Sequence, residues 1–179
     1  EAPMIPQGHE VAREQFQLTP GTYFQPVSQT TGTLTTNNTN AAVTVTAGDV
    51  RISINKRSGQ LTEFSKGNNR LLSSGPEPSF WRAPTDNDFG NNFHKLANVW
   101  RTAGLNTRVK NVTVNEQPGK VVVKVDMLLK DVSSDYTLEY TCLADGSLQV
   151  KVNYQAGAQE LPELPRFGNL FTLDRRFDK

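Results

Sequence analysis

Apolar and polar residues alternate over most of the chain after residue 41, and this pattern predicts β-strands. Val43 and Val45 alternate with threonines, and the alternation resumes at Val50, Ile52 and Ile54. A period of two residues is typical of strands with one buried face. By the same criterion, further strands are predicted at 61–64, 71–72, 109–114, 121–130, 136–143 and 148–154.

Short turn signals separate the predicted strands. Gly, Asn, Asp, Ser and Pro gather between them at 56–59, 66–69, 117–119, 133–135 and 144–146. Tight turns of this composition join antiparallel neighbours. Several short strands joined in this way predict an all-β, mainly antiparallel sandwich.

One stretch instead shows the spacing of a helix. Apolar residues fall at i, i+3, i+4 and i+7 at Phe93, Leu96, Ala97 and Trp100. Asn91 or Asn92 can cap the beginning of this segment, and Gly104 follows its end. The sequence therefore predicts a single short helix.

The N-terminal part of the chain has a different character. Residues 1–24 contain one strand-like run, at 10–18, which Pro20-Gly21 ends. Residues 25–41 are almost all Thr, Asn, Ser, Gly and Gln, a composition that buries little apolar area. We therefore expect a separate N-terminal piece at 1–24, a linker at 25–41 that is the least ordered internal stretch, and the main domain at 42–179.

Charge and composition narrow the function classes. The 179 residues contain 19 Lys and Arg and 18 Asp and Glu, a net charge of +1, which favours neither nucleic acid nor an anionic membrane as a partner. Cys142 is the single cysteine, so no internal disulfide is possible, and a small buried hydrophobic residue is the favoured interpretation. No apolar run reaches the ~18 residues of a membrane span. A start at Glu1-Ala2-Pro3 suggests a fragment of a longer protein, so the compartment stays unknown.

The most specific stretch of the chain is 80–91, which we call the signature loop. A turn alone needs Gly, Pro, Asn and Asp, but this loop also carries two aromatic residues and an arginine. Its sequence is Phe80-Trp81-Arg82-Ala83-Pro84-Thr85-Asp86-Asn87-Asp88-Phe89-Gly90-Asn91. It resembles the RAPTDND signature of bacterial β-galactosidases of glycoside hydrolase family two, at the start of their C-terminal β-sandwich domain.

Two further segments support this resemblance. The string Gly8-His9-Glu10-Val11-Ala12 resembles the last strand of the family's immunoglobulin-like sandwich, although Arg13 stands where an aromatic residue is expected. The segment Leu161-Pro162-Glu163-Leu164-Pro165-Arg166-Phe167-Gly168 resembles the family's LPxxPRxG motif, which leads into another strand. The resemblance thus covers nearly the whole chain, but only the first part of the family's C-terminal domain.

The resemblance implies a fold and an activity for the parent protein. The C-terminal domain would be part of a galactose-mutarotase-like supersandwich. The parent, a bacterial homo-oligomer, cytoplasmic or periplasmic, would hydrolyse terminal β-D-galactosides with retention, using glutamates in a separate (β/α)₈ barrel. Barrel residues would bind Mg²⁺ and Na⁺ or K⁺. In this chain we expect no catalytic residue and no metal ligand, and a role as scaffold, active-site rim and assembly element.

Asp86 and Asp88 are the one conspicuous acidic pair. Retaining glycosidases use two carboxyl groups about 5–5.5 Å apart, and in an extended segment residues two apart face the same side. A catalytic pair is nevertheless disfavoured. Hydrogen bonding within the loop and pairing with Arg82 are favoured, and a supporting role at the rim of the barrel's active site stays open.

Several loop residues are candidates for that rim, namely Trp81, Arg82, Asp86, Asn87, Asp88 and Gly90. Core or interdomain packing is favoured for Trp81, with contact to a sugar as the alternative; Trp100 lies on the helix stripe and is expected in the core. Gly90 could be the hinge of a mobile lip, and a plain helix entry explains the same residues equally well. We expect Phe80 and Trp81 to pack inward and a loop carboxylate or carbonyl to hold Arg82. Asp86, Asn87 and Asp88 are expected to be more exposed here than in the parent, where the barrel would be their neighbour.

Two rival functions are compatible with the sequence. A stand-alone carbohydrate-binding module would also be an antiparallel sandwich and would bind galactosides by itself. A free aldose mutarotase would share the supersandwich fold but needs a pair of histidines and a glutamate, and His9 and His94 are far apart in the chain. Neither histidine has a metal-site spacing, so His94 is interpreted as a surface helix residue.

Overall fold

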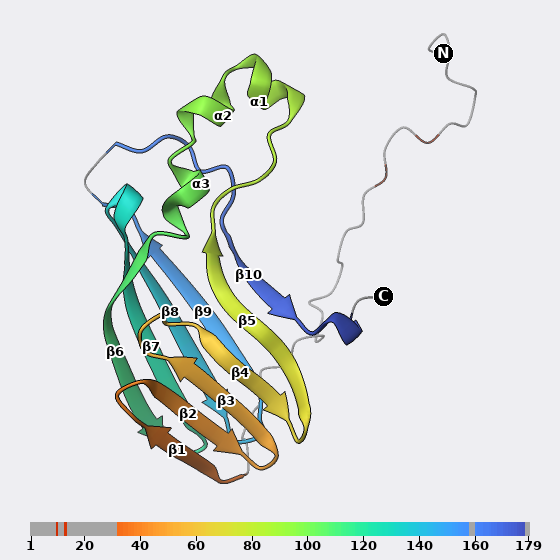
Figure 1. Ribbon diagram of the computed structural model, residues 1–179, viewed down its shortest axis with the longest axis vertical. Helices are drawn as coiled ribbons and strands as arrows, with labels where there is room; N and C mark the ends of the chain where they lie inside the picture. The colour runs from red at the N-terminus through yellow and green to blue at the C-terminus, as the bar shows by residue number, and fades with distance from the viewer. Residues whose placement is uncertain (1–9, 11–12, 14–31, 158–159, 178–179) are drawn as a thin grey trace.

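The structure is a computed structural model that describes residues 10, 13, 32–157 and 160–177 (Figure 1). The predicted N-terminal piece at 1–24, apart from Glu10 and Arg13, and the first part of the predicted linker lie outside the described residues.

The first of two sheets has six strands, in the order β1-β2-β3-β4-β5-β10 (Figure 1). Every pairing in it is antiparallel. Its strands are β1 (Leu34–Asn38), β2 (Ala42–Ala47), β3 (Val50–Asn55), β4 (Leu61–Lys66), β5 (Asn69–Ser79) and β10 (Gly168–Leu173).

The second sheet has four strands, in the order β6-β7-β8-β9, so that each strand pairs with its neighbour in sequence. All three pairings are antiparallel. Its strands are β6 (Thr107–Gln117), β7 (Lys120–Leu129), β8 (Ser134–Leu143) and β9 (Leu148–Gln155). Two antiparallel sheets confirm the predicted all-β class, and every strand predicted after residue 42 is present.

The core lies between the two sheets. Alternate residues of β2, β7 and β8 are buried, which is the pattern that their sequences predict, and β3 buries Ser53 in addition to its alternating apolar residues. One tie between the sheets is polar, since the buried Tyr140 hydroxyl donates to the Gly59 carbonyl at 2.7 Å. Gly59 has φ of +75°, and a Cβ there would lie 2.8 Å from a Val125 methyl, so glycine allows the turn to approach the second sheet closely.

The prediction of a linker at 25–41 is wrong for residues 34–38. Residues 34–38 form β1, which pairs with β2 from Leu34↔Ala47 to Asn38↔Val43. The strand was missed because Leu34 is its single large apolar side chain. As an edge strand, β1 is stabilised by backbone hydrogen bonds to β2, which demand little of the side chains.

The predicted single helix is also wrong in detail. The structure has three short helices, α1 (Asp86–Gly90), α2 (Phe93–Leu96) and α3 (Trp100–Ala103), which lie together at one end of the sandwich (Figure 1). The predicted segment is divided because residues 97–99 form a turn. Two 3₁₀ turns, η1 (Lys130–Val132) and η2 (Arg175–Phe177), complete the elements.

The flank of the sandwich at β10 is uncovered. Leu170, Phe171 and Leu173 of β10 are 50%, 47% and 56% exposed. The six-stranded sheet therefore ends in a strand whose apolar side chains lack a covering layer among the described residues.

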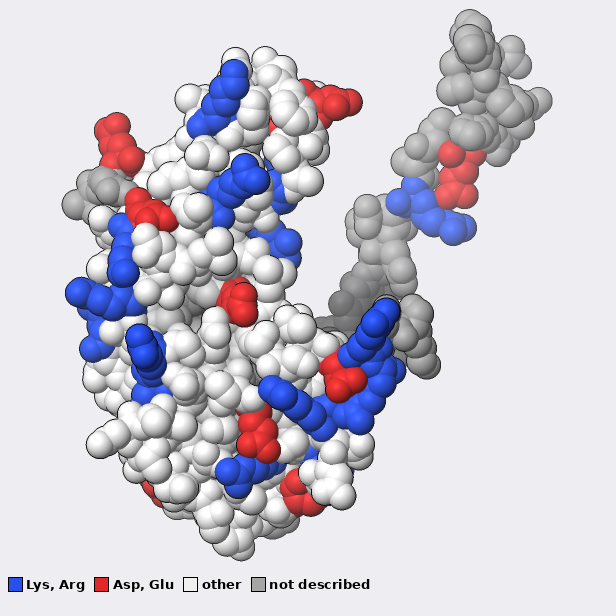
Figure 2. Space-filling model, in the orientation of Figure 1, with Lys and Arg blue, Asp and Glu red and all other residues white. Residues whose placement is uncertain are grey.

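One expectation from composition can be checked directly. Cys142 is fully buried in β8, and burial raises the pKa of its thiol to about 12, which confirms a buried apolar role. No described helix is long and apolar enough to cross a membrane. Acidic and basic side chains are interspersed on the visible face of the described residues (Figure 2).

Candidate functional site

The signature loop and the helices that follow it form a small subdomain, residues 80–103, which we call the cap. Phe80 fixes the cap to the sandwich. Its side chain is 1% exposed, and its ring centroid lies 5.7 Å from that of Trp100 and 6.0 Å from that of Tyr136. Tyr154 and Phe167 complete the ring cluster at 6.1 and 6.0 Å. The expectation that Phe80 packs inward is confirmed.

A second anchor of the cap is Trp100, whose burial confirms the predicted core role. Its side chain is 3% exposed, and its indole Nε1 donates to the Pro162 carbonyl at 3.0 Å. Since Pro162 belongs to the LPxxPRxG-like segment, this hydrogen bond joins two motifs that are far apart in sequence.

Polar contacts then shape the signature loop. The guanidinium of Arg82 binds both carboxylate oxygens of Asp88, at 2.5 and 3.0 Å. Thr85 adds a capping box at the beginning of α1, because its backbone N–H donates to Asp88 Oδ2 at 2.7 Å and its hydroxyl oxygen accepts from the Asp88 N–H at 3.4 Å. Arg82 also donates to the Ala83 carbonyl at 3.2 Å. The expected restraint of Arg82 is confirmed.

Asp88 is the ionised centre of this arrangement, which we call the clamp (Arg82, Thr85 and Asp88). The Arg82 hydrogen bond and then the Thr85 N–H hold the pKa of Asp88 well below its usual range, and the same contact raises the pKa of Arg82. The carboxylate therefore stays charged at neutral pH, and its oxygens are occupied within the loop.

The extended geometry assumed for the acidic pair is wrong. Asp88 is 7% exposed, whereas Asp86 and Asn87 are exposed. In a helix, residues two apart point about 200° away from each other. Because 86–90 is helical, Asp88 faces Arg82 and Asp86 faces solvent, so the two carboxylates do not share a cavity.

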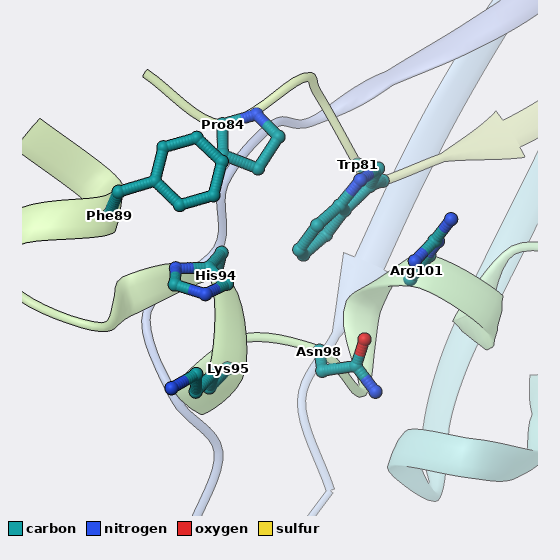
Figure 3. A pocket seen from close by; sticks show the side chains of 7 residues that line it. All are labelled: Trp81, Pro84, Phe89, His94, Lys95, Asn98 and Arg101. Atoms are coloured by element: carbon teal, nitrogen blue, oxygen red, sulfur yellow. The ribbon is translucent and has the colours of Figure 1, made fainter. Parts of the chain in front are cut away.

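A surface hollow of about 490 Å³ opens on the cap. Figure 3 shows the Trp81 ring standing between Phe89 and His94 on one side and Arg101 on the other. The lining comes from the loop and all three helices, and consists of Trp81, Pro84, Phe89, His94, Lys95, Asn98 and Arg101. It combines aromatic and apolar surface with basic groups, and no described acidic residue contributes to it.

The predicted rim residues divide into three groups around this hollow. Trp81 lines it and is half-buried, so its inward packing is only partial. Arg82 and Asp88 form the clamp that supports the loop. Asp86, Asn87 and Gly90 are exposed on α1, outside the lining of the hollow. The structure thus brings Trp81, Arg82 and Asp88 close together and leaves the other three at the outer surface.

Besides Pro84 and Phe89 of the signature loop, four more lining residues were not predicted as site residues. They are His94, Lys95, Asn98 and Arg101, on or next to α2 and α3. His94 is half-buried, its Nδ1 lies 3.2 Å from the Asp88 carbonyl oxygen, and its ring centroid is 4.7 Å from that of Phe89. Sequence spacing placed these residues on the polar side of a helix but gave no sign that this side faces Trp81.

The lining of the hollow offers aromatic surface and hydrogen-bonding side chains. Its lining lacks a carboxylate for acid–base or nucleophilic work on a glycoside. Among the described residues, no group of three His, Cys, Asp or Glu side chains is arranged to hold a metal ion.

Comparison with known proteins places this arrangement in a family. The family model described as β-galactosidase small chain matches residues 46–179, which include the signature loop and the whole of the cap. A β-galactosidase of Priestia megaterium is 36% identical over 171 residues, covering 96% of this chain and 16% of the relative. One from Halalkalibacterium halodurans is 31% identical over 176 residues, covering 96% of this chain and 17% of the relative.

A shorter relative is more nearly matched in length. The β-galactosidase small subunit of Latilactobacillus sakei is 28% identical over 166 residues, covering 76% of this chain and 52% of that protein. The chain therefore spans about a sixth of the two long relatives and about half of the small subunit.

Proposed function

This chain belongs to the β-galactosidase small-chain family, and from that premise we propose that it is a non-catalytic part of a larger β-galactosidase. The observation that carries the proposal is the family match over 46–179, which contains the complete cap. The parent, by which we mean this complete enzyme, hydrolyses terminal β-D-galactosides with retention through a pair of carboxylic acids in a separate barrel domain. In this proposal the cap forms part of the rim of the barrel's active site.

The geometry of the cap supports a rim function. Phe80 and Trp100 fix the cap to the sandwich, and the clamp fixes the course of the signature loop. Trp81 and Phe89 are left partly or largely exposed at its surface. A rigid support that presents aromatic side chains to the outside is suited to a position beside a substrate or another domain.

The uncovered flank supports the assembly part of the proposal. Three large apolar side chains of β10 are about half exposed, which is a costly arrangement for a free surface. We propose that another part of the parent covers Leu170, Phe171 and Leu173. As the family resemblance implies, we propose that the parent's Mg²⁺ and Na⁺ or K⁺ bind barrel residues.

Hydrolysis of a chromogenic β-galactoside tests the proposal. The parent is expected to turn the substrate over, and the 179-residue chain is expected to be inactive because its one acidic pair is divided between the clamp and solvent. The parent's coding sequence upstream of Glu1 should encode a barrel with two catalytic glutamates. Turnover by the isolated chain that Asp86→Asn or Asp88→Asn abolishes would contradict the proposal.

The partial exposure of Trp81 in the hollow favours one alternative, a carbohydrate-binding module. Sugars stack on aromatic rings, and the hollow also offers hydrogen-bond donors from Asn98 and Arg101. Calorimetry of the isolated chain with galactose and lactose separates the two functions. Saturable binding that Trp81→Ala removes would favour the module, and its absence would favour the rim element.

A further inference from the structure

We propose that the hollow of the cap is a docking site for a carboxylate-bearing, apolar segment of the parent's catalytic domain. This inference rests on the proposed function and gives the partner surface a chemical character. The site is built from Trp81, Pro84 and Phe89 on its apolar side and from Lys95 and Arg101 on its basic side.

The charges of the hollow define the first requirement for its occupant. Lys95 and Arg101 are exposed, and neither forms an ion pair with a described acidic residue. The nearest carboxylate in sequence, Asp88, is buried and is already bound by Arg82 and Thr85. A pair of unmatched cations beside a low-dielectric aromatic surface favours an anionic partner.

The apolar side of the hollow defines the second requirement. Phe89 is 55% exposed, and Trp81 is half-buried. Leu96, on α2, is 67% exposed and extends the apolar surface of the same cap. Aromatic residues and arginine together are typical of the centre of a protein interface. A protein segment satisfies both requirements better than a free anion does.

The cap is also rigid enough to dock without rearrangement. Ala97, Trp100 and Ala103 are buried at 0%, 3% and 0% exposure, and a Cβ on Gly104 would overlap the Pro78 carbonyl oxygen. α3 is thus held directly against β5. Because the lining residues stand on a fixed support, docking orders few side chains.

Carbodiimide coupling in the complete parent tests the docking directly. The reagent joins an amine to a carboxylate only when the two are in contact. Lys95 is expected to be linked to an Asp or Glu of the catalytic domain in the same chain, as identified by mass spectrometry. Lys66, exposed at the end of β4, is the control and should give no link to that domain. Absence of the Lys95 link, or a link to another copy of the chain, would overturn the proposal.

Charge reversal gives an independent measurement. Arg101→Glu in the parent should lower kcat/KM for a chromogenic galactoside about tenfold, because a repelled carboxylate displaces the rim. Arg101→Lys keeps the charge and should stay within about twofold, as should Lys66→Glu. The melting temperature of the isolated 179-residue chain should be unchanged by Arg101→Glu, since Arg101 is exposed.

Different results would exclude the proposed function and the docking site. If the parent does not hydrolyse galactosides, the proposed function fails. If the parent is active but Arg101→Glu behaves like Lys66→Glu, the docking site fails and the proposed function stands.

Discussion

The sandwich and the cap are stabilised by different means. In β7 and β8, alternate side chains are buried along the whole strand, so stability is distributed over many similar contacts. The cap depends on a few specific ones, chiefly the rings around Phe80, the Trp100 hydrogen bond and the clamp. Regular alternation can therefore be recognised from sequence, whereas the cap depends on which particular side chains meet.

The largest expected effect lies where the two regions join. Phe80→Ala should lower the free energy of unfolding by about 3–5 kcal/mol, because it removes a fully buried ring that contacts both the cap and the sandwich. Urea denaturation of the isolated chain measures it. Phe89→Ala is the matched control, since Phe89 is 55% exposed and its loss should change stability by less than about 0.5 kcal/mol. Equal losses would mean that the cap is packed throughout, as the sandwich is.

The clamp should make the cap sensitive to acid. The pKa of Asp88 is lowered in the folded chain, chiefly by Arg82, whereas an unfolded aspartate titrates near ~3.9. Protons then bind the unfolded state first, so the stabilisation is present at neutral pH and is lost as the pH falls below about 4. Asp88→Asn should melt at a lower temperature than wild type at pH 7, by less than Phe80→Ala, and the difference should shrink toward pH 3.

Melting temperatures between pH 7 and pH 3 test this expectation, with Asp86→Asn as the control. Asp86 is exposed on the same helix, so its variant should follow the wild-type profile. A constant difference between Asp88→Asn and wild type across the range would show that the clamp contributes through shape and not through charge.

The sandwich contains a buried hydrogen bond whose loss should have a smaller effect on stability. The Tyr140 hydroxyl donates to the Gly59 carbonyl, and burial raises the pKa of Tyr140, so the phenol stays protonated. Tyr140→Phe should lower the free energy of unfolding by about 1–2 kcal/mol, because it leaves a buried carbonyl without its donor. Tyr154→Phe, whose hydroxyl donates to Ser134 Oγ at 3.1 Å in a half-buried position, should cost less by the same denaturation assay.

The smallest expected effect has the opposite sign. The Oγ1 atom of Thr36 in β1 is buried and has no hydrogen-bond partner among the described residues. Thr36→Val keeps the shape and removes the desolvated hydroxyl, so it should raise stability by up to about 1 kcal/mol. Thr35→Val, exposed in the same strand, measures the general preference of strands for valine. An equal gain from both variants would show that the buried hydroxyl costs nothing.

The predictability of the fold follows the same division. Strands such as β2 and β7 were predicted because burial alternates with sequence position. β5 was predicted only at Leu71-Leu72, whereas the strand extends to Ser79. The prediction stopped short because Pro76 and Pro78 are residues that usually interrupt a strand. Both prolines lie beyond Gly75, the last residue of β5 that pairs with β4, and Pro76 falls at the register shift between β5 and β10.

The candidate site could be predicted in part from the sequence. The signature loop was identified, and the pairing of Arg82 with a loop carboxylate was predicted correctly. α1 was missed although Thr85 and Asp88 have the spacing of a capping box, a local signal that was available. The contribution of Arg101 could not be predicted, since it depends on how α3 is placed against Trp81, and no pattern within either segment determines that.

The order of strands in the second sheet has a consequence for how the chain folds. β6 to β9 pair only with sequence neighbours, through short connections such as the one between Gln117 and Lys120, so each pairing closes a small loop at little entropic cost. β10 instead pairs with β5, for example Gly168 with Ser79, and these partners are separated by the whole of the second sheet in the sequence. Low-contact-order hairpins form quickly and long-range pairings slowly. We therefore expect the four-stranded sheet to form early during synthesis, and the link between the cap and the LPxxPRxG-like segment to be completed last.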